Sequence, residues 1–215
     1  MTELTYDVTS RIADSGYIEA PFNQAKKKIE KARCKIISTE ENAMLRMQEG
    51  RWAEITKKGN ITRECLIFIP GEQHYFFSKI SPIIESAEKA TQIHRERKEF
   101  CPTRNQLERA TDPSVSIKIP LNQKYIPIKR LLEEEAGEFI LGQSLQDYSN
   151  FLRESKIKEF PINISYIEEL FGRAIAKPFI FRGLNEINKP LETLNQSNLS
   201  YNLRTRGIYL HNKIQ

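Results

Sequence analysis

The sequence is poor in the residues that metal centres and disulfide frameworks need. Its 215 residues include three histidines and three cysteines. The cysteines, Cys34, Cys65 and Cys101, are far apart and form no Cys-x-x-Cys pair, which argues against a zinc knuckle and against a set of disulfides. We therefore expect no metal site and a reducing, cytoplasmic setting for a soluble protein.

Signatures of membrane insertion and of cofactor binding are also missing. No apolar run approaches the roughly 20 residues of a membrane-spanning helix, and the polar N-terminus is unlike a secretory signal. The sequence contains no Gly-x-Gly-x-x-Gly, Gly-x-x-x-x-Gly-Lys or Gly-x-Ser-x-Gly motif. We expect no membrane partner and no cofactor. No motif in the sequence points to a known family.

The chain does contain enough apolar material for a folded core. Hydrophobic residues make up 39% and charged residues 28%, a balance too apolar for a disordered chain. Helix and strand patterns follow one another with no regular βαβ repeat, so we predict an α+β fold of helices interspersed with β-hairpins. Asp112-Pro113 is the predicted boundary between an N-terminal region, 1–111, and a C-terminal region, 112–215. The alternative is one continuous domain.

Helical periodicity and capping signals predict the helices. Apolar residues at spacings of three and four predict a basic amphipathic helix over 22–37. Capping boxes at 38–41 and 103–106 open two more helices, and Gly50 is placed to end the first of these. Further helices are predicted to begin at Ser81-Pro82, Ser144 and Ser165, and to cover about 129–141.

Alternating and β-prone segments predict the strands. We expect a hairpin within 51–69 that turns at 57–60, and a further strand at 75–77. The alternation over 115–119 predicts a half-buried strand that pairs with 125–128. Residues 179–181 form another predicted strand. At the end of the chain, 199–203 and 208–211 are predicted to form a terminal hairpin joined by 204–207.

Positive charge is concentrated in two segments. The formal net charge is +5, and segments 22–37 and 170–215 each carry a net charge of +5. Two basic patches predict a polyanionic partner. The middle of the chain is nearly balanced and contains an acidic run at 133–138. We interpret this run as the solvated first turn of a helix, or alternatively as an internal mask for a basic patch.

Basic and aromatic side chains together favour a nucleic-acid-binding protein, in a processing or defence system, that contacts the backbone of DNA or RNA. Clustered lysines suit phosphates. Arginines interleaved with Phe179, Phe181, Tyr201 and Tyr209 suit single strands, whose bases stack and whose phosphates pair. The predicted nucleic-acid-binding residues are Lys26, Lys27, Lys31, Arg173, Arg182, Arg204 and Arg206. The same patterns also fit a solvated helix face and a packed core strand.

Two alternative functions remain. One is a metal-independent nuclease or hydrolase, with His74, His94 and His211 as the candidate catalytic residues. Arg206 and His211 have a spacing found in some metal-independent ribonucleases, but the residues between them favour a strand where that motif needs a helix. His94 falls on an apolar helix face, as structural histidines do. The other alternative is an adaptor whose basic helix docks an acidic protein partner.

Overall fold

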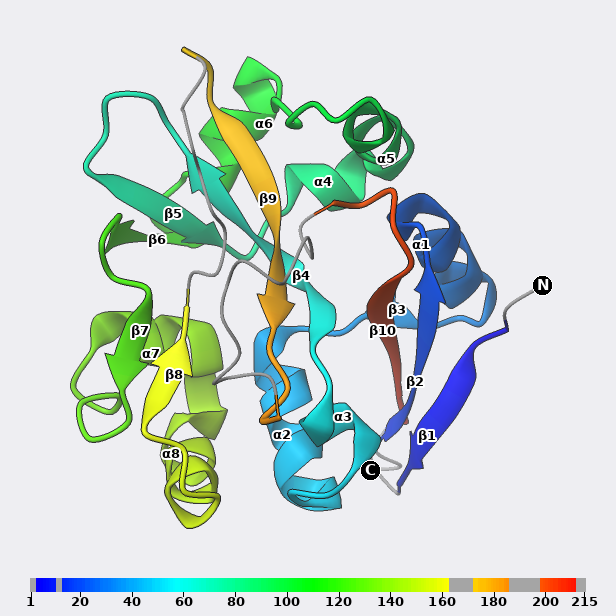
Figure 1. Cartoon of the computed structure of the whole chain (residues 1–215), viewed down its shortest axis with the longest axis vertical. Coiled ribbons are helices and arrows are strands. Elements are labelled where there is room, and N and C mark those ends of the chain that lie inside the picture. Colours follow the sequence, from blue (N-terminus) through cyan, green and yellow to red (C-terminus); the bar gives the residue numbers. More distant parts are fainter. Residues whose placement is uncertain (1–2, 11–12, 163–171, 186–197, 212–215) are drawn as a thin grey trace.

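The computed structural model describes residues 3–10, 13–162, 172–185 and 198–211 (Figure 1). Helices and strands are interspersed along these ranges, which confirms the predicted α+β class. The strands are β1 (Thr5–Thr9), β2 (Ala13–Ala20), β3 (Lys35–Ile36), β4 (Asn60–Phe68), β5 (His74–Ser78), β6 (Ser116–Pro120), β7 (Tyr125–Pro127), β8 (Glu159–Pro161), β9 (Ile175–Phe181) and β10 (Leu203–Leu210). The helices are α1 (Phe22–Lys31), α2 (Thr39–Glu49), α3 (Glu54–Lys57), α4 (Pro82–Glu85), α5 (Ala87–Arg95), α6 (Arg104–Ala110), α7 (Glu135–Leu141), the 3-10 turn η1 (Gly142–Ser144) and α8 (Leu145–Glu154).

One sheet joins the beginning and the end of the chain. Its strand order is β1-β2-β10-β4-β5-β6, with β3 also paired to β10 and β9 also paired to β4. The pair β10–β4 is parallel and meets at a single bridge, Thr205–Ile61, whereas the other pairs are antiparallel. The sheet therefore runs across the predicted boundary at Asp112-Pro113, and the division of the chain into two regions stays a prediction.

Alternate residues of β4 point into two hydrophobic cores on opposite faces of the sheet. Leu66 and Phe68 belong to one core, which is closed by α7, α8 and the small β7–β8 sheet. Cys65 and Ile67 belong to the other core, to which α1, α4, α5 and α6 contribute (Figure 1). Within the described ranges, none of the helices combines the length and the apolar character that crossing a membrane would require.

Both predicted capping boxes are confirmed. In α2 the Ser38 hydroxyl accepts from the backbone N–H of Glu41, whose carboxylate accepts from the Ser38 N–H. The same reciprocal bonds join Thr103 and Gln106 at α6. Gly50 ends α2 with φ 83°, a conformation that side-chain-bearing residues rarely adopt. These ends were predictable because every bond involved lies within one turn of the chain.

Several predicted helices are shorter than expected. The basic helix ends at Lys31, and the chain then turns through Arg33, which has φ 58°, into β3. Ile36 is buried there because β3 pairs with β10. The helix from Ser81-Pro82 is divided at Ser86 into α4 and α5. The helix predicted over 129–141 covers only Glu135–Leu141, and α8 follows Ser144 as expected. The helix predicted from Ser165 falls outside the described residues.

The predicted strand pairings are wrong in two places. Residues 54–57 form α3 instead of a strand, so β4 has no hairpin partner before it and pairs with β5, the strand expected at 75–77. β6 likewise pairs with β5 and not with 125–128, because β7 pairs with β8. The patterns at 60–68, 75–77, 115–119 and 125–128 identified strands correctly, whereas the pattern before 57 did not. The choice of strand partners was made by packing across the sheet.

The predicted terminal hairpin is also wrong. Residues 203–210 form one unbroken strand, β10, so the expected turn at 204–207 lies in the middle of the sheet. Gly207 is required there for close packing and not for turning. A Cβ at this position would lie 2.9 Å from Cγ2 of Ile29 and 3.1 Å from Cβ of Cys34, so glycine allows α1 to approach β10.

Candidate anion-binding groove

Arg206 belongs to the interior of the protein. The side chain is fully buried, and its two Nη atoms donate to the two carboxylate oxygens of Asp7 at 2.6 and 2.7 Å. Its Nε donates to Asn60 at 3.3 Å, which adds a third fixed contact. A bidentate pair of this kind satisfies a buried charge, so Arg206 ties β10 to β1 and is not presented to a ligand.

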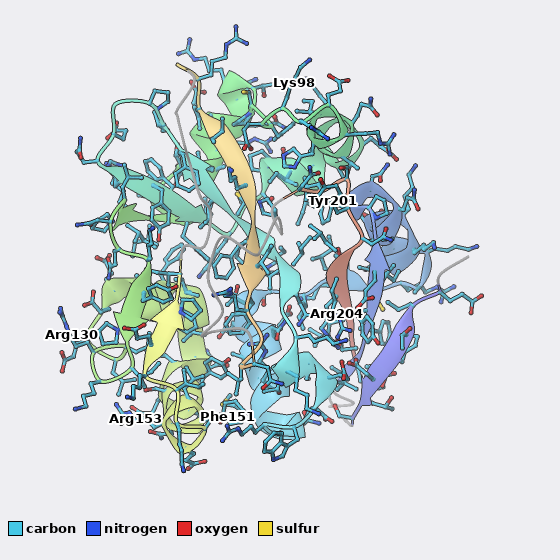
Figure 2. The ribbon with its side chains drawn as sticks, in the orientation of Figure 1. Lys98, Arg130, Phe151, Arg153, Tyr201 and Arg204 are labelled. Carbon is cyan, nitrogen blue, oxygen red and sulfur yellow. The ribbon has the colours of Figure 1, made fainter. Side chains whose placement is uncertain are left out.

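Arg204 is held in a similar way at the start of β10. Its guanidinium lies 2.8 Å from Glu19 and 3.3 Å from Glu54, and it stacks 3.7 Å above the ring of Tyr17. Figure 2 shows the side chain beside β10, on the side of β2. Two carboxylates therefore neutralise its charge. The neighbouring hollow of about 320 Å³, lined by Glu19, Lys58 and Arg204 among others, gains little positive field from it.

The other predicted residues of the C-terminal segment divide between core and surface. Arg182 is buried, and its carbonyl accepts from buried Arg46 at 2.7 Å. Arg173 is exposed. Phe179 and Phe181 are core residues of β9, whereas Tyr201 and Tyr209 are about half exposed. The structure therefore does not bring the predicted arginines and aromatic rings together on one surface.

The three histidines have separate partners. His74 Nδ1 lies 3.4 Å from Glu72, and His211 Nε2 lies 3.0 Å from Asp14. His94 is buried, and its Nδ1 accepts from the backbone N–H of Leu199 at 3.1 Å, so it fastens α5 to the segment before β10. In the described part of the chain, no three His, Cys, Asp or Glu side chains are arranged to hold a metal ion.

Helix α1 places the predicted lysines at the edge of a surface groove. Phe22, Ala25 and Ile29 are buried, and the lysines occupy the remaining circumference. Lys26 pairs with Glu30 at 2.6 Å within the helix, and Lys27 pairs with Glu88 of α5. Lys31 is exposed at the last turn.

The basic groove consists of two adjoining hollows of about 460 and 340 Å³ that share Lys26, Glu30, Ile84 and Glu85. It is lined by α1, β3 and β4 on one part and by the segment from Ser81 into α5 on the other. Its charged lining residues are Lys26, Lys27, Lys35, Arg63, Lys79, Lys89, Glu30, Glu85 and Glu88. Six cations thus face three carboxylates. The ammonium of Lys79, however, lies 4.2 Å from the ring centre of Phe139 and is engaged there.

Only part of this groove was predictable from the sequence. Lys26 and Lys27 were predicted as binding residues, and Lys35 lies in the same basic segment. Arg63 and Lys89 were missed. Arg63 had a detectable signal, because it is the one cation in the β-prone segment that forms β4. Lys89 had none, since its approach to α1 depends on how α5 folds back across the chain.

Comparison with known proteins identifies the fold but no family. No family model matches the chain, and no curated protein matches it either. A solved structure described as the "accommodation of massive sequence variation in Nanoarchaeota by the C-type lectin fold" is similar, with a TM-score of 0.61 and 11% sequence identity. The match covers 94% of this chain and 99% of that one. The chain therefore has a C-type lectin-like fold. At this identity the likeness defines the fold alone.

Proposed function

We propose that the protein binds nucleic acid through phosphate contacts along the basic groove. The observation that supports this proposal is the excess of cations over carboxylates among the described residues that line two adjoining hollows, even when Lys79 is left out. These cations come from separate parts of the chain. Cationic side chains along a groove attract a polyanion and release its counterions on contact, which makes the affinity strongly dependent on salt.

The existing ion pairs in the groove do not prevent such binding. Lys27 and Glu88 are mostly exposed, and Lys35 and Arg63 are partly exposed. Exposed pairs contribute only about 0–1 kcal/mol, so a phosphate can replace a carboxylate at little cost. A protein that uses these cations should bind with modest affinity at physiological salt.

The composition of the groove favours backbone contacts over base contacts. Among the residues that the structure describes, no aromatic ring lines the two hollows. Stacking on aromatic rings is the usual way to hold unpaired bases. The groove therefore lacks the platform that the interleaved aromatics of the C-terminal segment were expected to provide, and we infer binding that is largely independent of sequence.

The fold itself does not account for this charge. The similar solved structure is described as a C-type lectin fold that accommodates massive sequence variation. We infer that a fold of this type tolerates wide surface changes, so the basic groove is a property of this chain. Arg204 and Arg206, in contrast, serve the packing of β10 here and are not part of the proposed site.

Fluorescence anisotropy with mixed-sequence single- and double-stranded DNA and RNA tests the proposal. We expect binding at about 50 mM salt that weakens steeply towards 200 mM. The variant Lys26→Gln/Lys27→Gln should reduce the slope of log affinity against log salt by about 1.4 for single strands, if each lysine neutralises one phosphate. The matched control is Lys156→Gln/Lys158→Gln, two exposed lysines between α8 and β8 on the opposite side of the molecule (Figure 1).

If Lys26→Gln/Lys27→Gln and Lys156→Gln/Lys158→Gln lost equal amounts of affinity, the overall positive charge of the protein, and not the groove, would drive binding. Absence of binding at low salt would contradict the proposal. In that case the adaptor hypothesis predicts a stable complex with an acidic protein in size-exclusion chromatography. The nuclease hypothesis predicts cleavage that is lost in one of the three His→Ala variants.

A further inference from the structure

Two cations from neighbouring segments line the larger hollow of the groove. Lys35 belongs to β3 and Arg63 to β4. The backbone N–H of Arg63 donates to the carbonyl of Ile37 at 2.9 Å, so the chain just after β3 runs directly beside β4. Both side chains line the same hollow and are partly exposed, at 48% for Lys35 and 42% for Arg63.

Lys35 is held by a carboxylate that is itself fixed at the N-terminus of α2. One oxygen of Glu41 accepts from the backbone N–H of Ser38, as part of the capping box. The other oxygen lies 2.6 Å from the Lys35 ammonium. Burial alone would raise the pKa of Glu41, but Lys35 and Ser38 outweigh it and hold this pKa below its ordinary value. Glu41 is thus a fixed anion that sets the position of Lys35.

Arg63 also lies beside a carboxylate, that of Glu64, but the contact is looser. One oxygen of buried Glu64 accepts from the N–H and the hydroxyl of Thr39, at 3.1 and 2.9 Å. The other oxygen lies 3.6 Å from Nε of Arg63. Glu41 and Glu64 are thus both anchored at the N-terminus of α2. Glu41 holds Lys35 directly, whereas the separation between Glu64 and Arg63 is longer than a hydrogen bond.

Most of the N–H donors of Lys35 and Arg63 remain available to bind a ligand. Nε of Arg63 faces Glu64 at 3.6 Å without a hydrogen bond. Within the described residues the two Nη atoms of Arg63, with four N–H donors, have no protein partner. Lys35 has two further N–H donors beyond the one directed at Glu41. A planar guanidinium fork beside an ammonium matches a tetrahedral oxyanion, because the fork binds two oxygens and the ammonium a third.

We propose that Lys35 and Arg63 form a clamp for a single phosphate group in the basic groove. The inference deepens the proposed function and rests on it where the phosphate belongs to a nucleic-acid backbone. The same chemistry would hold a free phosphate compound, so the test includes one probe of each kind.

Four variants test the clamp against a mixed-sequence oligonucleotide and against inorganic pyrophosphate, the first by anisotropy and the second by titration calorimetry. Arg63→Gln and Lys35→Gln should each weaken oligonucleotide binding and reduce the salt slope by about 0.7 to 0.9. Arg63→Lys keeps the charge and loses the fork, so we expect an unchanged salt slope and roughly tenfold weaker binding of both probes. Arg130→Gln is the control, because this exposed arginine lies across the molecule from α1 (Figure 2). Unchanged thermal unfolding shows that each variant is folded.

The outcomes separate the clamp from the proposed function. If oligonucleotides bind but Arg63→Lys matches the unaltered protein and Arg63→Gln matches Arg130→Gln, the groove binds nucleic acid and the clamp is wrong. If pyrophosphate binds through Arg63 and no oligonucleotide does, the clamp is supported and the proposed function is wrong. If neither probe binds at low salt, both are wrong.

Discussion

At the scale of single residues, buried charge is the most consequential feature. Arg46, Arg206 and Glu64 are each almost fully removed from water. Taking an ion out of water costs several kcal/mol unless hydrogen bonds and a counter-charge replace the lost hydration. Asp7 supplies the counter-charge for Arg206, whereas Arg46 donates to the carbonyls of Phe181 and Arg182 and lies over the Phe181 ring. Glu64 has the least complete compensation, because its cation is 3.6 Å away.

Replacing Glu64 by glutamine should change how stability depends on pH. Burial raises the pKa of Glu64 above its ordinary value of 4.5, against the opposing hydrogen bonds from Thr62 and Thr39. The folded state therefore binds this proton more tightly than the unfolded state. The stabilisation that comes from binding this proton is complete at pH values below the pKa that Glu64 has in the unfolded chain. It is lost as the pH rises through the pKa that Glu64 has in the folded protein.

Glutamine stays neutral at every pH and can still accept from Thr39. We expect the free energy of unfolding of Glu64→Gln to be close to that of the original protein near pH 4 and to exceed it at pH 7. Urea unfolding between pH 4 and 8 measures this difference. Glu138→Gln, at an exposed position in α7, controls for the loss of a negative charge. A variant that is less stable at pH 7 would show that the carboxylate bonds outweigh its burial.

At the scale of elements, the docking of α1 on β10 places one wall of the groove. The backbone N–H of Phe22 donates to the carbonyl of Leu199, which joins the start of α1 to the segment before β10. Ile29 lies over Gly207 at the other end of the helix. The lysines of α1 keep their places in the groove only while this contact remains close.

The variant Gly207→Ala should loosen this contact. The added Cβ would approach Ile29 and Cys34 more closely than packing normally allows. Overpacking of this kind typically costs about 1–3 kcal/mol, so we expect a loss of that size in the free energy of unfolding. In a double-mutant cycle with Ile29→Ala, which removes the crowded atoms, the cost of the added methyl group should fall. If the losses in the free energy of unfolding of Gly207→Ala and Ile29→Ala were additive in the double variant, direct crowding of the added methyl group by Ile29 would be contradicted.

At the scale of the whole molecule, the sheet makes the two halves of the chain depend on each other. β10 lies between β2 and β4, and β9 covers a further length of β4 (Figure 1). Without these strands, β2 and β4 would each expose an unpaired edge and part of a core. The same arrangement brings α1 and β3 from one part of the chain beside β4, and so creates the basic groove.

Fragments of the chain test this dependence. We expect the fragment 1–111 to be unfolded by circular dichroism when expressed alone, because it lacks β9 and β10 and thus the centre of its own sheet. Mixing it with 112–215 should restore structure, and the full chain should unfold in one cooperative transition. A fragment 1–111 with a well-dispersed NMR spectrum would instead establish Asp112-Pro113 as a true domain boundary.

Local signals predicted what local bonds control. The capping boxes at Ser38 and Thr103 were predictable because their donors and acceptors lie three residues apart. Lys26 and Lys27 were predictable as groove residues because the apolar stripe of α1 leaves them outside the core. From the sequence, Arg204 and Arg206 were predicted to lie in a turn, because a glycine next to polar residues, as at Gly207, is typical of turns. Their true environment depends on Glu19 and Asp7, whose distance along the chain no local pattern spans.

By itself the sequence determined the α+β class, both ends of α2, the start of α6, the alternation of β6 and the positive charge of α1. Each of these depends on neighbouring residues or on composition. Only the tertiary structure decided that the last strand enters the middle of the sheet, that its arginines are buried, and that Lys35 and Arg63 meet at the groove. Those outcomes depend on contacts between residues far apart in the chain, because burial and ion pairing are settled only when distant segments pack together.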